Sequence, residues 1–358
     1  MINSSRSIQI CPTNTYETQQ ALASIRSKGH FAYISESVSS PWGRAFNDQT
    51  VGNQDRLVAI SLQKMSGIHE LDRTNMTVTI GAGISFEQLQ LGLANTGLEW
   101  PVQGLPGQSS VVEAILAGIA KVNSALFPDI RPWVLGSTLV TGTMKTVHSG
   151  GSTMKNSSGY ALTRALIGSH GVFGVPTELK LRLRPNTETS SQTLTGSHFM
   201  YESLESALSD PAMAQRLEIS IDQMSILTTL YLAGSDGAQY KSTCSSVSRP
   251  THFAKDKNIG KTDHLFIPRH NEFMIKWQAS PYKCCQIAEN IIGTGSVRDV
   301  LILPLQRMGF AVSDDANFTR YIQETGLEFS RLPFSELAVR ALHENPIVQA
   351  LNPEGLLR

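Results

Sequence analysis

The sequence has little charge, few cysteines and no long apolar run, and each shortage excludes a class of protein. Thirty Lys and Arg residues balance thirty Asp and Glu residues among 358, so the chain lacks the basic excess that nucleic-acid binders usually carry. No stretch of about 18 apolar residues occurs, so we expect no membrane span. The first residues contain no apolar run typical of a signal peptide, and we therefore expect a cytoplasmic protein.

The cysteine and histidine patterns predict neither a disulfide framework nor a metal site. The four cysteines, none of them in a CxxC pair, are Cys11, Cys244, Cys284 and Cys285. The nine histidines form no HxxxH or HExxH spacing that would hold a metal ion. We interpret His148 and His170, which lie in the glycine-rich part of the chain, as turn or packing residues.

Hydrophobic patterns in the first half of the chain predict strands and helices in an α+β arrangement. Short strands are predicted at residues 8–10, 31–34, 57–60 and 76–80. Ser85 and Gln88 have the spacing of a capping box, which predicts that a helix begins there. The clearest strand is Glu178–Pro185, in which leucines that face a core alternate with Lys and Arg that face water.

We place a domain boundary in the Ser- and Thr-rich segment 186–197, which we expect to be a linker. The expected units are residues 1–185, with subdomains of about 1–62 and 63–185, then a second domain at 198–335, then a C-terminal helix and tail at 336–358. Within the second domain, the polar residues 241–262 predict an exposed loop.

Glycine is concentrated between Gly142 and Gly174, where seven of the 28 glycines lie. In this region a short predicted helix is released by Gly168 and followed by a turn with three glycines in seven residues. Such a density indicates close main-chain approach or φ values that other residues avoid. One interpretation is a packing turn with no ligand. The other is a backbone cradle for an extended, flat, anionic ligand, because bare N–H groups bind phosphate oxygens.

The run Lys-Asn-x-x-Gly-Tyr-x-Leu-x-Arg-x-x-x-Gly-Ser-x-Gly-x-x-Gly-Val-x-Thr-Glu occupies residues 155–178. It resembles the signature of the FAD-binding domain of the vanillyl-alcohol oxidase (PCMH-type) family, and is most similar to the FAD-binding subunits of bacterial glycolate oxidases. The similarity is dense from Trp133 to Pro185, extends more loosely to the N-terminus, and returns in the segment 351–357.

The resemblance implies that two α+β subdomains hold FAD, and that a smaller cap domain built on an antiparallel sheet covers the isoalloxazine ring. It implies that the backbone of Gly174 and Val175 meets the adenine end, with Asn156 near the middle of the ligand. The family's first loop here has neither His nor Cys, so we expect non-covalent FAD. The expected cofactor-binding residues are Ser109, Ser110, Gly118, Lys155, Asn156, Gly159, Gly168, Ser169, Gly171, Gly174 and Val175.

Two segments that match the family's phosphate loops have glutamates, Glu36 and Glu113, in stretches where the family has glycine. A carboxylate about 4 Å from a phosphate costs about 1 kcal/mol in water and about 4 kcal/mol at an effective dielectric constant near 20. With both side chains turned toward the ligand, FAD would be mostly lost. With both turned away, Ser109 and Ser110 could still donate hydrogen bonds and Lys155 could offset charge. The sequence leaves both arrangements open.

The resemblance implies an FAD-dependent oxidoreductase subunit that acts on a 2-hydroxy acid such as glycolate, together with a second flavoprotein subunit and an iron–sulfur subunit. The metal-binding His motif of the catalytic subunit is absent, so we assign no catalytic base. An alternative is a non-catalytic structural subunit that keeps the fold but has weakened or lost FAD binding. A third interpretation takes Gly81-Ala82-Gly83 as a nicotinamide-dinucleotide turn, although its third glycine and its acidic residue are missing.

Overall fold

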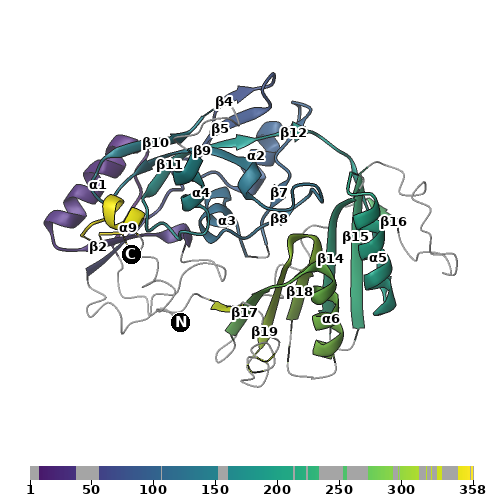
Figure 1. The fold of residues 1–358 in the computed structure, drawn as a ribbon. Coiled ribbons are helices and arrows are strands. Elements are labelled where there is room, and N and C mark those ends of the chain that lie inside the picture. Colours follow the sequence, from purple (N-terminus) through teal and green to yellow (C-terminus); the bar gives the residue numbers. More distant parts are fainter. Residues whose placement is uncertain are drawn as a thin grey trace.

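The chain folds into two lobes, each with its own sheets and its own apolar core (Figure 1). This computed structural model describes residues 8–37, 56–105, 107–151, 160–212, 214–222, 225–233, 253–255, 273–292, 297, 299–313, 320, 324, 329–332, 346–354 and 356–357. Helices and antiparallel sheets are mixed along the chain, so the predicted α+β class is confirmed. None of the helices in these ranges is both long enough and apolar enough to cross a membrane.

The first lobe begins with a small parallel sheet and one helix. Its elements are β1 (Ile8–Ile10), α1 (Thr15–Ser27), β2 (Phe31–Ile34), the 3-10 turn η1 (Ser35–Ser37) and β3 (Leu57–Ile60). The strand order is β1-β3-β2, so β2 is an edge strand. Helix α1 begins where the Asn14 side chain accepts a hydrogen bond from the Glu17 N–H at 2.9 Å. It buries Leu22 and Ile25 against the core.

A five-stranded antiparallel sheet forms the centre of the first lobe. Its strands are β4 (Ile68–Asp72), β5 (Thr77–Gly81), β9 (Val134–Val140), β10 (Thr146–Gly150) and β11 (Val175–Arg182), in the order β10-β9-β11-β5-β4. Leu179 and Leu181 of β11 are fully buried, whereas Lys180 and Arg182 are only half-buried on the opposite face. The predicted alternation is confirmed, and the strand begins earlier than predicted, at Val175.

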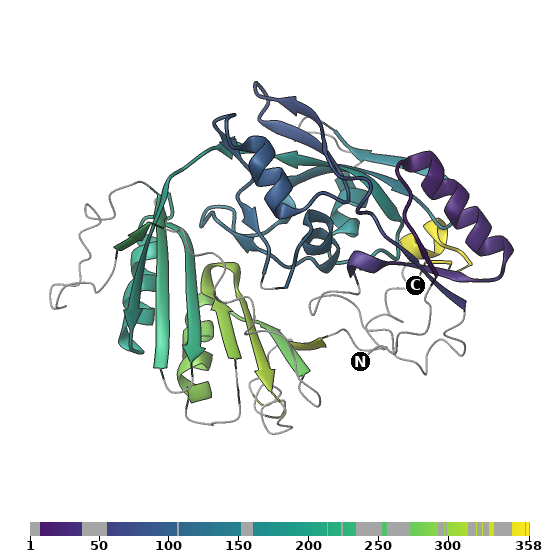
Figure 2. The same ribbon diagram turned by 180° about the vertical axis from the view of Figure 1, so that it is seen from behind.

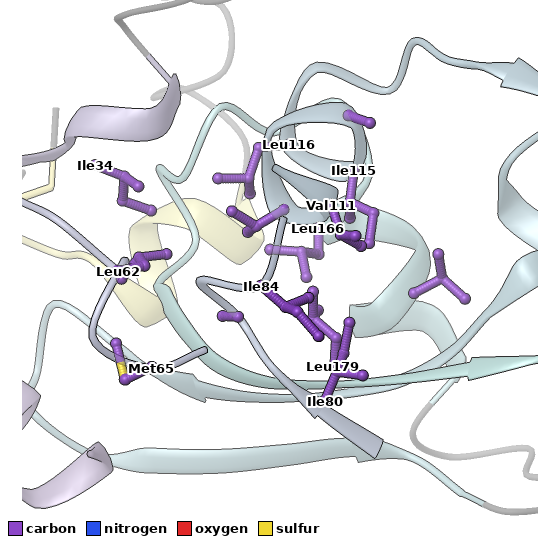
Figure 3. Close-up of a cluster of buried hydrophobic side chains, with 14 of the residues drawn as sticks. Ile34, Leu62, Met65, Ile80, Ile84, Val111, Ile115, Leu116, Leu166 and Leu179 are labelled. Atoms are coloured by element: carbon purple, nitrogen blue, oxygen red, sulfur yellow. The ribbon is translucent and has the colours of Figure 1, made fainter. Parts of the chain in front are cut away.

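Three short helices cover the core side of this sheet. They are α2 (Phe86–Leu93), α3 (Val111–Ala117) and α4 (Tyr160–Leu166), and the smaller elements are β6 (Leu98–Glu99), β7 (Val102–Gln103), β8 (Lys121–Val122), η3 (Arg131–Trp133) and β12 (Arg184–Pro185). The Ser85–Gln88 capping box of α2 is present, as predicted. Figure 3 shows Ile115 and Leu116 of α3 in the same apolar cluster as Ile80 and Leu179 of the sheet.

The second lobe is one eight-stranded sheet with two helices on one face (Figures 1 and 2). The strands are β13 (Thr189–Thr195), β14 (Ala214–Asp222), β15 (Ser225–Ala233), β16 (Phe253–Lys255), β17 (Phe273–Gln278), β18 (Asp299–Leu303), β19 (Met308–Ser313) and β20 (Phe329–Leu332). The helices are α5 (His198–Ser209) and α6 (Pro281–Ile292), and η5 (Pro304–Gln306) joins β18 to β19. All described pairs are antiparallel, in the order β16-β13-β15-β14-β18-β19-β17-β20, which confirms the expected antiparallel sheet.

The two faces of this sheet have different partners. In β18, Val300 and Ile302 belong to the cluster that includes the residues of α5 and α6. Leu301 and Leu303 instead pack with Ile119 and other apolar residues of the first lobe. Because successive strand residues point to opposite faces, the apolar run of β18 is buried on both sides. The lobes are therefore joined by a continuous apolar contact.

Two expected loops contain strands of the large sheet. The predicted linker at 186–197 includes β13, which pairs with β15 from Thr189 to Thr195. The predicted loop at 241–262 includes β16, which pairs with β13. Both expectations were wrong at these residues: β13 is rich in Ser and Thr and has no apolar alternation that would indicate a strand, and β16 is too short, at three residues, to show a period. The other residues of the expected loop, 241–252 and 256–262, lie outside the described residues.

The last described residues return to the first lobe. Helix α9 (Pro346–Leu351) packs Val348 against Val172 and Phe173. The Asn352 side chain then bonds the backbone of Leu357 twice. Its Nδ2 donates to the Leu357 carbonyl at 2.8 Å, and its Oδ1 accepts from the Leu357 N–H at 3.1 Å. Leu357 forms a parallel bridge with Ala32 of β2. The C-terminal residues thus lie beside the edge strand β2 (Figure 1).

Candidate functional site

A cleft of about 180 Å³ lies where the first lobe meets the sheet of the second lobe. The first lobe contributes Ala117, Gly118, Ala120, Gly168 and residues 128–131, and the second contributes Lys276, Gln278, Gln306 and Met308. The alternation of β17 explains its share: Ile275 and Trp277 are buried in the cluster beneath α5 and α6. Lys276 and Gln278 therefore point to the other face of the sheet, toward the first lobe.

Two glycines give the cleft a wall of bare backbone. Gly118 ends α3 with a φ of 66° and Gly168 follows α4 with a φ of 81°, both in the left-handed region that favours glycine. A Cβ on Gly118 would lie 3.0 Å from the Gly168 Cα, whereas a Cβ on Gly168 would meet no atom within 4 Å. The Gly168 main chain therefore borders open space, which is the geometry that close approach of a flat ligand requires.

Three charged side chains line the same cleft. Arg131 Nη1 and Asp129 Oδ2 form an ion pair at 2.5 Å on the first lobe, and half-buried Lys276 faces them from the sheet. Burial, together with a smaller effect of the Arg131 guanidinium, lowers the pKa of Lys276 to about 8, and the Asp129 carboxylate partly opposes this shift. Within the described part of the chain, Lys276 forms no ion pair of its own. The cleft is thus suited to a ligand with a negative charge.

The Glu36 carboxylate accepts hydrogen bonds from groups within the protein. Its side chain is buried, and its Oε1 accepts hydrogen bonds from the Leu62 N–H at 2.7 Å and the Ser61 hydroxyl at 2.9 Å. The Ser35 hydroxyl donates to Oε2 at 3.0 Å. These bonds hold the carboxylate between β2 and the end of β3, so both of its oxygens are bonded within the protein.

Glu113 is also committed to internal bonds, at the start of α3. It forms a capping box with Ser110, and its Oε2 accepts from the Ser109 N–H at 2.8 Å and the Ser110 N–H at 3.4 Å. The Ser110 hydroxyl accepts from the Glu113 N–H at 3.3 Å. Ser109 and Ser110 therefore direct these groups to Glu113, and a ligand would have to compete for them. Neither Glu36 nor Glu113 lines the cleft.

The other expected site residues lie in or beside the glycine-rich bend. A Cβ on Gly171, whose φ is 87°, would lie 2.7 Å from Ile34 Cδ1. A Cβ on Gly174 would lie 3.1 Å from the Val140 carbonyl oxygen, and Val175 pairs with Val140 in the sheet. Protein atoms therefore fill the space on the Cβ side of both glycines, and their ligand contacts stay a prediction. Ser169 is buried within the bend, and Lys155, Asn156 and Gly159 lie outside the described residues.

Packing also explains the Gly81-Ala82-Gly83 run. A Cβ on Gly81 would overlap the Met65 carbonyl, and one on Gly83 would overlap the Leu62 carbonyl. The Gly83 N–H donates to the Met65 carbonyl at 3.0 Å. These glycines let two chain segments cross, and no nicotinamide dinucleotide is needed to account for them. In the described ranges, no group of three or more His, Cys, Asp or Glu side chains could hold a metal ion.

Lys276 and Arg131 were not singled out from the sequence. Lys276 interrupts the apolar run of residues 273–277, and a cation at the centre of a buried strand was a usable signal. Arg131 follows an irregular loop, so no periodicity indicated which way it points. The two residues are 145 positions apart in the sequence, and only the packing of the lobes brings them to one cleft.

Comparison with known proteins supports a flavin nucleotide as the ligand. Residues 7–150 match the family model described as FAD binding domain. The chain is 31% identical over 128 residues to a D-lactate dehydrogenase of Archaeoglobus fulgidus, an alignment that covers 36% of this chain and 29% of that protein. It is 30% identical over 126 residues to the glycolate oxidase subunit GlcE of Escherichia coli, covering 35% of this chain and 36% of that protein. The chain thus spans about a third of the length of these relatives.

Solved structures show the same fold over nearly the whole chain. The 6-hydroxy-D-nicotine oxidase of Arthrobacter nicotinovorans superposes with a TM-score of 0.69 at 16% identity, covering 99% of this chain and 92% of that one. An alkyldihydroxyacetonephosphate synthase superposes with a TM-score of 0.68 at 12% identity, covering 97% and 75%. Two features of the structure are compatible with FAD. The Gly168 backbone borders open space, and the Glu36 and Glu113 carboxylates are hydrogen-bonded within the protein. Residues 7–150 are therefore similar to FAD binding domains, and nearly the whole chain shares the fold of these solved structures.

Proposed function

We propose that this chain is an FAD-dependent oxidoreductase subunit that acts on a small 2-hydroxy acid such as glycolate. The observation that carries the proposal is the cleft, where a bare-backbone wall of the FAD domain faces the cation Lys276 across from Arg131. The relatives support the substrate class, because their names share 2-hydroxy acids: D-lactate, glycolate and D-2-hydroxyglutarate.

In the proposed reaction, the chain's own residues bind and orient the substrate. Lys276 and Arg131 bind its carboxylate from two sides, because guanidinium and ammonium groups form strong charge-assisted hydrogen bonds with carboxylates. Asp129 holds Arg131 in place through their ion pair. Bound FAD would accept a hydride, and the protein would supply orientation and electrostatics. We assign no general base.

The residues proposed to hold FAD fall into two sets. The backbone at Gly118 and Gly168 would lie against the flat ring system, since it borders the cleft. The remaining expected residues, from the phosphate loop and the glycine-rich signature, would bind the rest of the nucleotide; they are Ser109, Ser110, Lys155, Asn156, Gly159, Ser169, Gly171, Gly174 and Val175. We expect the cofactor to be non-covalent.

We further propose that the chain works in a cytoplasmic complex with a second flavoprotein subunit and an iron–sulfur subunit. The support is the name of two relatives, the glycolate oxidase subunits GlcE of Escherichia coli and GlcD of Bacillus subtilis. The partners would accept the electrons that leave the flavin.

The purified chain should be yellow and should show the visible absorption of an oxidised flavin. Removing the flavin and titrating FAD back, with binding followed by the quenching of flavin fluorescence, should give a dissociation constant in the micromolar range or below, which corresponds to about 8 kcal/mol of binding free energy. Adding glycolate without oxygen should bleach the visible band. Colourless protein that takes up no added FAD would overturn the proposal.

One observation favours a second function, that of a structural subunit with weakened FAD binding. Glu113 occupies the Ser109 and Ser110 N–H groups that a phosphate would otherwise bind. Under this alternative, Glu113→Gln removes a negative charge beside the phosphates and should raise FAD affinity tenfold or more, a gain of about 1.4 kcal/mol.

We expect FAD affinity to change less than threefold in Glu113→Gln, because the amide oxygen can keep the cap and the native carboxylate already accepts hydrogen bonds from the Ser109 and Ser110 N–H groups. Glu87→Gln is the matched control, since Glu87 is exposed in the first turn of α2. The measurement is FAD titration of both variants and the parent protein. A tenfold gain in FAD affinity in Glu113→Gln, but not in Glu87→Gln, would favour the structural subunit with weakened FAD binding.

A further inference from the structure

A buried charge cluster joins the two lobes beside their apolar contact. It consists of Lys121 from β8 and of Arg216 and Glu218 from β14, and we call it the β8–β14 charge cluster. Glu218 Oε1 lies 3.0 Å from Lys121 Nζ and 2.7 Å from Arg216 Nε. The side chains of Lys121, Arg216 and Glu218 are 14%, 6% and 13% exposed. Glu218 thus pairs with a cation from each lobe.

Arg216 extends this cluster along the first lobe. It donates to Gln103 Oε1 at 2.9 Å and also bonds the Asn123 side chain. Its guanidinium carbon lies 4.0 Å from the centre of the Tyr231 ring, which fixes its plane. Gln103 and Lys121 are cross-strand partners in the β7–β8 ribbon. Arg216 and Glu218 of the cluster therefore bind the β7–β8 ribbon at Gln103 and Lys121, and bind Asn123, the residue that follows it.

The paired cations keep Glu218 in its charged form. Burial raises the pKa of Glu218, but Lys121 and Arg216 outweigh burial and bring it down to about 2. Glu218 is accordingly ionised at neutral pH.

The β7–β8 ribbon is continuous in sequence with the wall of the cleft. Lys121 follows Ala120, which lines the cleft and whose carbonyl accepts from the Gln306 amide at 3.2 Å. Gly118 lies two residues before Ala120 and belongs to the bare-backbone wall. A shift of the ribbon relative to β14 would therefore move this wall relative to the sheet that carries Lys276.

We propose that Glu218 is a positioning residue: by pairing with Lys121 and Arg216, it sets the width of the cleft and hence the separation of Arg131 from Lys276. Glu218 itself does not line the cleft. Its importance for the reaction rests on the proposed function. Its effect on cleft geometry does not, and can be measured without flavin or substrate.

The test uses the reactivity of Lys276 as a gauge of the cleft. Glu218→Gln keeps the shape of the side chain and removes the charge, and Glu205→Gln is the matched control because Glu205 is exposed on α5. Each full-length variant is acetylated briefly at pH values from 6 to 11, and the labelling of each lysine is read by mass spectrometry. We expect a Lys276 midpoint near pH 8 in the parent and in Glu205→Gln. In Glu218→Gln it should rise to about 9 or above, because Arg131 recedes and water enters.

An unchanged Lys276 midpoint in folded Glu218→Gln would overturn the proposal. A merely structural role would lower the melting temperature and leave this midpoint where it was. If Glu218→Gln does not fold, Lys121→Gln removes the inter-lobe ion pair and leaves the Arg216 pair, and it should move the midpoint in the same direction by a smaller amount. No movement in Lys121→Gln would then overturn the proposal.

A second measurement separates this inference from the proposed function. In FAD-loaded protein, Glu218→Gln should weaken oxalate binding at least tenfold relative to Glu205→Gln, and equal affinities would overturn the positioning role. Should the parent protein bind no oxalate, the proposed function fails, and the Lys276 labelling profile alone decides whether Glu218 positions the cleft.

Discussion

Glutamine at both Lys276 and Arg131 should weaken the binding of oxalate, an unreactive analogue of a 2-hydroxy acid, by about 100-fold or more. Each hydrogen bond to a charged group contributes about 1.5–3 kcal/mol, and the cleft offers one such partner from each lobe. Each single variant should lose about tenfold. Isothermal titration calorimetry on FAD-loaded protein measures the change.

The same binding should depend on pH in a defined direction. Lys276 has its pKa lowered to about 8, so it is cationic below that pH and increasingly neutral above it. An anion binds the protonated form better, so affinity should fall as pH rises past 8, and Lys276→Gln should abolish this dependence. Lys145→Gln, which changes an exposed lysine of the first lobe, is the control.

A variant with glutamine at both Lys276 and Arg131 that binds oxalate as tightly as Lys145→Gln would show that the cation pair does not bind carboxylates.

Gly83→Ala should destabilise the first lobe by about 3 kcal/mol or more, near the upper end for a single substitution. A Cβ at this position would overlap the Leu62 carbonyl, and a backbone group cannot rotate away as a side chain can. The neighbouring Gly83 N–H bond to Met65 would break as the segments separate. Urea denaturation followed by circular dichroism gives the change in unfolding free energy.

Gly29→Ala separates the crowding at Gly83 from the general cost of losing glycine. Gly29 has a φ of 68° and nothing within 4 Å of its would-be Cβ, so alanine there should cost only about 1–2 kcal/mol of backbone strain. If Gly83→Ala proved no more destabilising than Gly29→Ala, the crossing of the 62–65 and 81–83 segments would not be as tight as the structure has it.

Features governed by neighbouring residues could be predicted from the sequence. The capping box of Ser85 and Gln88 needs only a three-residue spacing, and the structure contains it. The alternation of β11 reports directly which side chains face the core, because strand geometry fixes the period at two. The glycine-rich signature at residues 155–178 indicated a flavin nucleotide, and the match of residues 7–150 to an FAD binding domain supports the same cofactor from the preceding part of the chain.

Features that depend on distant contacts could not be predicted. Strand β13 has no apolar alternation, and it is a strand because β15 and β16 supply its hydrogen bonds. The cation pair of the cleft exists only because η3 and β17 meet when the lobes pack. Whether Glu36 faces a ligand depended on donors at Ser61 and Leu62, which no pattern around Glu36 indicated. For Glu113, the Ser110–Glu113 spacing is that of a capping box, so the sequence held a usable signal that the side chain bonds to the backbone.

The bridge between Ala32 and Leu357 has a consequence for synthesis on the ribosome. Strand β2 lies at the edge of its sheet, and its outer neighbour Leu357 is translated 325 residues after Ala32. Until then a nascent chain exposes an open strand edge, which can template pairing with another molecule. Crowded polysomes should therefore be the setting in which this protein is most prone to misassemble, and slower initiation should raise the yield of soluble product.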